Sequence, residues 1–161
     1  MIYSESPDVI RIAGCIPDSA VDGPGVRYTL FFQGCHHNCF GCHNLSTHSW
    51  DDGDFEDVPV EIIVENFKAT AAANRITISG GEPFCQPQAL LTLVKTFAVE
   101  GVKDIWLYTG YELSELTSDV QREILTYVSS LVTGRFVISE TEGAQLFTGS
   151  ANQQVHRLRD V

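Results

Sequence analysis

The amino-acid sequence predicts a single α/β domain, residues 1–161, folded as a partial, open (β/α) barrel with a mostly parallel sheet. Short runs of β-favouring residues alternate along the chain with segments whose apolar residues recur at helical spacing. That alternation is typical of parallel sheets with right-handed crossovers. A complete eight-stranded barrel typically needs about 250 residues. This chain has only 161, so the barrel is expected to remain open.

The first predicted strand is residues 27–32, RYTLFF, which are rich in aromatic and β-favouring side chains. Residues 50–59 form the most polar stretch and are interpreted as an acidic surface loop. Residues 60–74 follow with apolar side chains at helical spacing, which predicts a helix with one buried face. Residues 75–79, RITIS, are the second predicted strand and end at two glycines.

The second half of the chain continues the alternation. A helix is expected at residues 87–100, with proline in its first turn and Gly101 at its end. Residues 104–108, DIWLY, are the third predicted strand, and residues 119–128 are another helix. Residues 130–138 contain a fourth strand or a bent pair of strands.

The composition is that of an ordinary globular protein with a strongly acidic balance. Apolar residues make up 43% and charged residues 19%, and the net charge is −11. An acidic surface repels phosphate groups, so we expect no nucleic-acid partner and no binding to anionic membranes. No apolar run approaches the roughly 18 residues that cross a bilayer, and residues 1–14 lack a signal-peptide pattern. A cytoplasmic location is therefore expected.

Three of the five cysteines lie together directly after the first predicted strand. Cys35, Cys39 and Cys42 have the spacing C-x3-C-x2-C. Thiolates so closely spaced suit zinc or an iron–sulfur cluster. A histidine of the same loop could complete a Cys3His zinc site. A [4Fe–4S] cluster usually takes four cysteines, so three would leave one iron open for chemistry.

Two further motifs follow the next two predicted strands. SGGEP occupies residues 79–83, and Thr-Gly-Tyr occupies residues 109–111. Loops at the carboxyl ends of parallel strands share one edge of the sheet, so both motifs should meet the cysteine loop at one mouth. Gly80 and Gly81 would let the backbone approach a ligand closely. Glu82 could accept a hydrogen bond from an ammonium group.

The cysteine spacing resembles the signature of the radical S-adenosylmethionine (radical SAM) family. The resemblance implies a barrel of the radical SAM type in which Cys35, Cys39 and Cys42 hold a [4Fe–4S] cluster. In that family the unique iron binds S-adenosylmethionine, which explains a set of three cysteines. DGPGVRYTLFFQGC, residues 22–35, is similar to the segment before the cluster in glycyl-radical-enzyme activases.

Two later segments narrow the resemblance. DIWLYTGY, residues 104–111, and FTGSANQQVHRLR, residues 147–159, look like the small activases of anaerobic ribonucleotide reductase. SGGEP resembles the glycine-rich turn that contacts the methionine moiety in the family. The implied contacts to S-adenosylmethionine are Gly41, Cys42, His43, Gly80, Gly81 and Glu82. Gly41 stands where many radical SAM enzymes have an aromatic residue, and His43 stands where the small activases often have tyrosine.

The resemblance also implies an activity. A flavodoxin-like donor would reduce the cluster, S-adenosylmethionine would be cleaved, and the 5′-deoxyadenosyl radical would take a hydrogen atom from a partner's glycine. The implied partner is the large subunit of anaerobic ribonucleoside-triphosphate reductase. An activase of another glycyl radical enzyme, such as pyruvate formate-lyase, is the alternative. A non-enzymatic zinc-binding interaction module is a second alternative.

Overall fold

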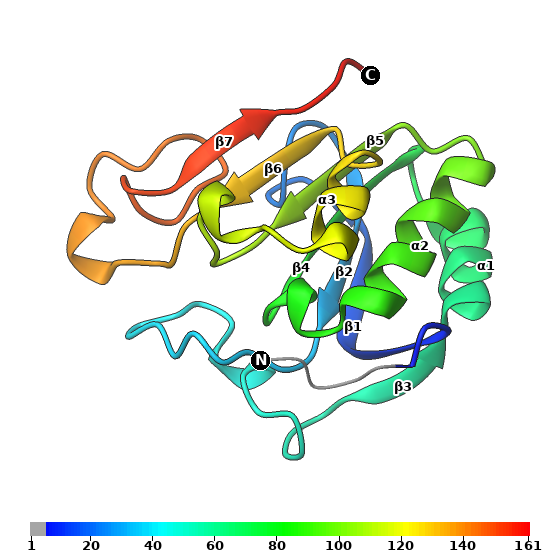
Figure 1. The fold of residues 1–161 in the computed structure, drawn as a ribbon, viewed down its shortest axis with the longest axis horizontal. Coiled ribbons are helices and arrows are strands. Elements are labelled where there is room, and N and C mark those ends of the chain that lie inside the picture. Colours follow the sequence, from blue (N-terminus) through cyan, green and yellow to red (C-terminus); the bar gives the residue numbers. More distant parts are fainter. Residues whose placement is uncertain (1–5) are drawn as a thin grey trace.

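The structure is a computed structural model that describes residues 6–161. Residues 1–5, the start of the stretch that lacks a signal-peptide pattern, lie outside this range. The described strands form one seven-stranded sheet in the order β3-β1-β2-β4-β5-β6-β7 (Figure 1). The four central strands are β2 (Arg27–Phe32), β4 (Arg75–Gly80), β5 (Asp104–Tyr108) and β6 (Ser130–Thr133), and they are parallel. The predicted open α/β architecture is confirmed.

Three helices connect these strands, at the places where the sequence predicts them. They are α1 (Val60–Thr70), α2 (Pro87–Val99) and α3 (Asp119–Leu125). Each ends before its predicted limit; after α1, for example, Ala71 already has an extended backbone. Short 3-10 turns occur at Leu45–Thr47, Pro83–Cys85, Leu113–Glu115 and Ile138–Glu140. Within residues 6–161, no helix is both long and apolar enough to cross a bilayer.

Both edges of the sheet are antiparallel, which the sequence analysis did not predict. β1 (Val9–Ser19) pairs with β2, and β3 (Glu56–Pro59) pairs with β1. β7 (Gln154–Arg157) pairs with β6 at the opposite edge. The interpretation of residues 50–59 as a loop is therefore wrong for its last four residues, because they form β3.

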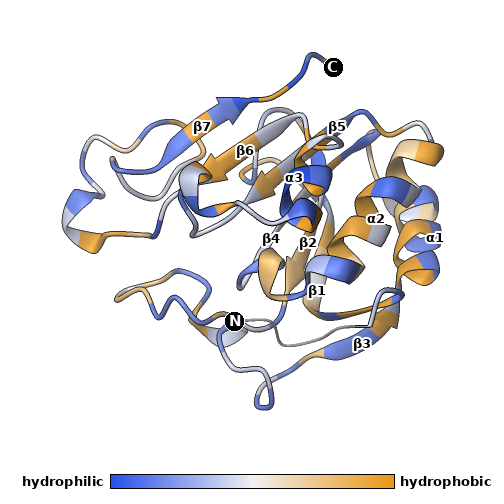
Figure 2. Cartoon of the chain, in the orientation of Figure 1, coloured by the Kyte–Doolittle hydropathy of each residue, from blue (hydrophilic) through white to orange (hydrophobic). Residues whose placement is uncertain are grey.

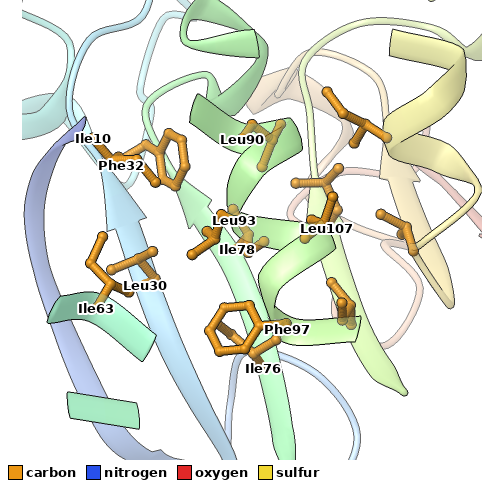
Figure 3. Packing of buried hydrophobic residues seen from close by; sticks show 14 of the residues in the cluster. Ile10, Leu30, Phe32, Ile63, Ile76, Ile78, Leu90, Leu93, Phe97 and Leu107 are labelled. Atoms are coloured by element: carbon orange, nitrogen blue, oxygen red, sulfur yellow. The ribbon is translucent and has the colours of Figure 1, made fainter. Parts of the chain in front are cut away.

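One face of the central sheet builds the core. Leu30 on β2 lies in register with Ile78 on β4, and both are completely buried. Figure 3 shows these side chains packed against the apolar residues of the helices. In Figure 2 the hydrophobic colour accordingly gathers on the central strands and on α1 and α2. Thr29 and Thr77 lie in register on the other face, which is more polar, and both are also completely buried.

A buried arginine joins three of the parallel strands at their amino ends. Arg27 begins β2 and its side chain is fully buried. Its Nη2 and Nη1 atoms donate to the two carboxylate oxygens of Asp104, at the start of β5, over 2.8 and 3.0 Å. Its Nε donates to Thr77 on β4 over 2.8 Å. This geometry satisfies the guanidinium and fixes the relative register of the three strands.

Candidate cofactor site

A cavity of about 580 Å³ lies at the carboxyl ends of the parallel strands. Its wall includes the cysteine loop after β2, the glycine turn after β4 and residues 108–110 at the end of β5. The members that the sequence singled out are Cys35, Cys39, Cys42, His43, Gly80 and Gly81. The expectation that three separated motifs meet at one mouth is confirmed.

The three cysteines share this cavity as free, half-buried thiols. Burial raises the pKa of the Cys35 thiol to about 12. The backbone N–H of His37, which hydrogen-bonds to this sulfur, lowers the pKa by a smaller amount. A metal centre would therefore have to displace the proton from this thiol, as iron and zinc do. Within residues 6–161, no three His, Cys, Asp or Glu side chains converge closely enough for a single ion. Three thiols on one loop are the ligand set of a [4Fe–4S] cluster that leaves one iron open.

The glycine turn packs directly on the cysteine loop. The backbone N–H of Gly81 donates to Phe32 at the end of β2 over 2.8 Å, and that of Glu82 donates to Gly34 over 2.8 Å. A Cβ atom added to Gly81 would overlap the carbonyl of Gly34, and one added to Gly80, where φ is +102°, would overlap the backbone of Phe32. Glycine is thus required here by contact between two segments of the chain as well as by any ligand.

Changing Gly81 to alanine is expected to push Gly34, and with it the cysteine loop, away from the turn. Overpacking of this kind typically costs about 1–3 kcal/mol of the free energy of unfolding. We expect a lower urea midpoint and less iron and acid-labile sulfide per chain after anaerobic reconstitution. Gly143→Ala is the control, because that residue has a positive φ but no atom within 4 Å of an added Cβ. Equal iron contents in the two variants would contradict the prediction.

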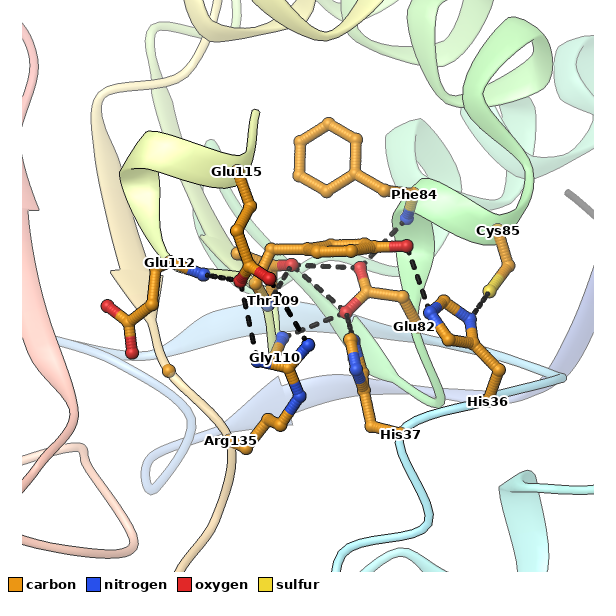
Figure 4. A network of polar contacts seen from close by, with 12 residues as sticks. His36, His37, Glu82, Phe84, Cys85, Thr109, Gly110, Glu112, Glu115 and Arg135 are labelled. Carbon is orange, nitrogen blue, oxygen red and sulfur yellow. Dashed lines mark hydrogen bonds and ion pairs between the residues drawn. The ribbon is translucent and has the colours of Figure 1, made fainter. Parts of the chain in front are cut away.

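Glu82 does not line the cavity, and its carboxylate is completely buried. Figure 4 shows that it lies at the centre of a polar network. Its Oε2 atom accepts hydrogen bonds from the backbone N–H of Gly110 at 2.8 Å and from Nε2 of His37 at 2.6 Å. Both of its oxygens also lie within 3.0 Å of the Thr109 hydroxyl. The carboxylate therefore ties the glycine turn to the cysteine loop and to the end of β5.

The two remaining predicted positions on the cysteine loop differ in placement. His43 lines the cavity, and its ring lies 5.0 Å from that of Phe136. Gly41 has a φ of +73° and does not line the cavity; it packs against Ile138 instead. Gly41 thus allows the loop to turn tightly beside the segment that follows β6.

Several cavity residues were missed by the sequence analysis. Residues 20–22 contribute from the β1–β2 connection, and residues 146–149 and Phe136 contribute from the long segment between β6 and β7. The hydroxyl of Tyr108 donates to the carbonyl of Phe147 over 2.7 Å, which holds that segment against β5. Asp22 and residues 147–149 fall within two segments that resemble the activases, but no contact was predicted for them. The others lie in no motif, because they reach the cavity only through the packing of irregular loops.

Comparison with known proteins identifies the family. Residues 21–156 match the model of the 4Fe-4S single cluster domain. The anaerobic ribonucleoside-triphosphate reductase-activating protein of Vibrio cholerae is 40% identical over 147 residues, which cover 88% of this chain and 94% of that protein. The chain belongs to this family of activating proteins. A relative of the same name in Escherichia coli K12 is 38% identical, and the match covers 89% of this chain and 96% of that protein. Another in phage T4 is 32% identical, and the match covers 86% of this chain and 88% of that protein.

The matched family model describes a domain that holds a single [4Fe–4S] cluster, and the relatives are named as activators of a reductase. This sets aside the non-enzymatic zinc module. The solved structure of QueE from Escherichia coli has the same kind of fold, with a TM-score of 0.53 and 18% identity over 63% of this chain and 52% of that one. Three thiols in a cavity bordered by the glycine turn fit a [4Fe–4S] cluster with S-adenosylmethionine as its ligand. A buried ring nitrogen of His37, which has no partner among residues 6–161, also fits a bound group.

Proposed function

We propose that this protein installs a glycyl radical on the large subunit of anaerobic ribonucleoside-triphosphate reductase. The observation that carries the proposal is the meeting of three thiols and the glycine turn in one cavity beside a sheet that does not close. The names of the relatives point to this reductase as the target. When bound, the cluster and S-adenosylmethionine supply a 5′-deoxyadenosyl radical, which accepts the hydrogen atom from glycine.

The chain's own residues would hold and orient these groups. Cys35, Cys39 and Cys42 would each ligate one iron and leave the fourth for S-adenosylmethionine. Gly80 and Gly81 would place their backbone groups against its methionine portion, since both line the cavity. On the cysteine loop, His43 would contact the cofactor beside Cys42, and Gly41 would shape the loop around it. Glu82 would act on the cofactor through its buried network.

A macromolecular substrate suits the open side of the fold. The antiparallel edge strands β3 and β7 do not meet, so the chain alone does not enclose a small molecule. A partner protein could close the mouth by inserting a glycine-bearing loop. The electron would come from a flavodoxin-like donor, and the setting would be the cytoplasm, where thiols stay reduced. A nucleic-acid or membrane partner is not part of the proposal, given the net charge of −11.

Electron paramagnetic resonance on an anaerobic mixture tests the proposal. The mixture contains iron-reconstituted protein, reductant, S-adenosylmethionine and the large reductase subunit of the same organism. A glycyl-radical doublet that requires every component is the expected result. If 5′-deoxyadenosine forms without a doublet, the target is another glycyl radical enzyme, such as one of the pyruvate formate-lyase type. If neither product appears although the cluster is complete, the proposed activity is wrong.

A further inference from the structure

His37 is an unusual member of the cavity wall because one side of its ring is bonded and the other is not. Its side chain is only 3% exposed. Nε2 lies 2.6 Å from Oε2 of Glu82, whereas the buried Nδ1 has no hydrogen-bond partner among the described residues. A buried polar atom without a partner typically costs about 1–3 kcal/mol. An unpartnered polar atom on a residue of the cavity wall therefore calls for a partner outside the described residues.

The ring cannot easily turn to satisfy Nδ1 elsewhere. A Cβ atom on Gly110 would overlap the ring, so the absence of a side chain at that position makes room for it. On another side Tyr111 packs edge-on, with ring centroids 4.8 Å apart at 79°. His36 lies 4.5 Å away and is itself held by Tyr111 over 2.9 Å and by Cys85 over 3.0 Å. The orientation of His37 is therefore set by its surroundings before any ligand binds.

Glu82 determines which ring nitrogen carries the hydrogen. A buried carboxylate only accepts hydrogen bonds, and Glu82 already accepts from the backbone N–H groups of Phe84 and Gly110. Nε2 of His37 must consequently donate to it. In the neutral ring this leaves a lone pair on Nδ1, so the missing partner is a hydrogen-bond donor. Carboxylates orient histidines at metal centres in the same manner.

Thiolates that ligate a cluster offer no such donor, whereas S-adenosylmethionine has several. Its amino group is the donor expected beside the cluster, where the unique iron would hold the methionine portion. His37 stands between Cys35 and Cys39, and its backbone N–H already acts on the Cys35 thiol. We propose that Nδ1 of His37 accepts a hydrogen bond from the amino group of S-adenosylmethionine, with Glu82 as the residue that orients the ring. The inference rests on the proposed cluster ligands and cofactor. It assigns to His37 the direct contact that the sequence suggested for Glu82, whose oxygens are taken up by the protein.

Two substitutions of His37 separate this role from a structural one. His37→Gln can place an amide near the position of Nε2 and keep the link to Glu82, but it has no atom equivalent to Nδ1. His37→Asn can place its amide oxygen near Nδ1 but does not reach Glu82. The measurement is the dissociation constant of S-adenosylmethionine, from titration of the reduced, reconstituted proteins followed by the change in the cluster's paramagnetic resonance spectrum. His156→Gln is the matched control, because His156 on β7 bonds to Thr133 and lies outside the cavity wall.

We expect His37→Gln to raise the dissociation constant about five- to tenfold, as loss of one hydrogen bond implies. His37→Asn should raise it less, and His156→Gln should not change it. The opposite order, with His37→Gln milder, would show a structural tether to Glu82 and overturn the inference. His37→Gln could instead leave the dissociation constant unchanged and alter the reduction potential of the cluster in the absence of S-adenosylmethionine. That result would place the contact of His37 on the cluster and would also overturn the inference.

A third variant tests the position of the ring hydrogen without changing His37 itself. Glu82→Gln leaves His37 in place but can donate to Nε2, which would move the ring hydrogen to Nδ1 and remove the acceptor. It should weaken binding as much as His37→Gln; binding equal to that of the wild type would contradict the inference. If the unmodified protein takes up no cluster, or takes one up and binds no S-adenosylmethionine, the proposed function itself fails.

Discussion

Cys39→Ala is expected to abolish the glycyl-radical signal and most of the bound iron. The cysteine loop supplies three thiols to the cavity, and no fourth cysteine lines its wall. With two thiolates left, a second iron would lose its protein ligand, and a cubane so weakly held should decompose or fail to assemble. Iron and acid-labile sulfide analysis after anaerobic reconstitution measures the first effect. Paramagnetic resonance with the large reductase subunit measures the second.

The matched control for this prediction is Cys15→Ala. Cys15 is an exposed, free thiol on β1, and its Sγ atom lies a long 3.9 Å from Oδ1 of Asn66. Its removal should leave iron content and radical formation unchanged. A Cys39→Ala protein that retained a full cluster would show that Cys39 is not a ligand, and attention would turn to the histidines of the loop.

Asp104→Ala is expected to be the most destabilising of the substitutions considered. It would leave the guanidinium of Arg27 without its carboxylate in a fully buried position. Removing one partner of a buried ion pair typically costs about 3–5 kcal/mol. Arg75 also lies 3.5 Å from Asp104, so an exposed second pair would be lost as well. Anaerobic urea unfolding of the metal-free protein should show a much lower midpoint at an unchanged slope.

Glu123→Ala is the appropriate comparison, since it removes a carboxylate from an exposed pair. Glu123 and Lys95 are 44–45% exposed and lie 2.5 Å apart. Exposed pairs of this kind contribute about 0–1 kcal/mol. If the two variants lost similar stability, the burial of Arg27 would not explain the effect, and strand register would have to be maintained by other contacts.

The sequence predicts the parallel core well because two signals agree there: the strands are rich in β-favouring residues, and they alternate with segments of helical spacing. RYTLFF, RITIS and DIWLY are buried strands with β-favouring residues, and they became β2, β4 and β5 with nearly the predicted limits. The edge strands carry weaker signals. β3 is EDVP, whose charges and proline are typical of a loop. β1 is long but has two register shifts against β2, so its inward and outward residues do not alternate regularly.

At the site, spacing and strand order were sufficient to predict that the cysteines and Gly80–Gly81 would meet. The role of Glu82 could not be derived in this way. A carboxylate in a turn looks available to a ligand, and only the positions of Thr109, Gly110 and His37 reveal that its oxygens are already bonded. His37 was equally hidden, because a histidine beside a cysteine suggests metal binding before it suggests a buried hydrogen-bond acceptor.

The open sheet also has a consequence for self-association. A closed barrel has no edges, whereas this sheet presents two outer strands whose free backbone groups could recruit another copy of the chain. Both outer strands are only four residues long. β3 carries Glu56, Asp57 and Pro59, and β7 carries Arg157, features that discourage strand addition. The fold can therefore leave its mouth open to a large partner without inviting edge-to-edge aggregation.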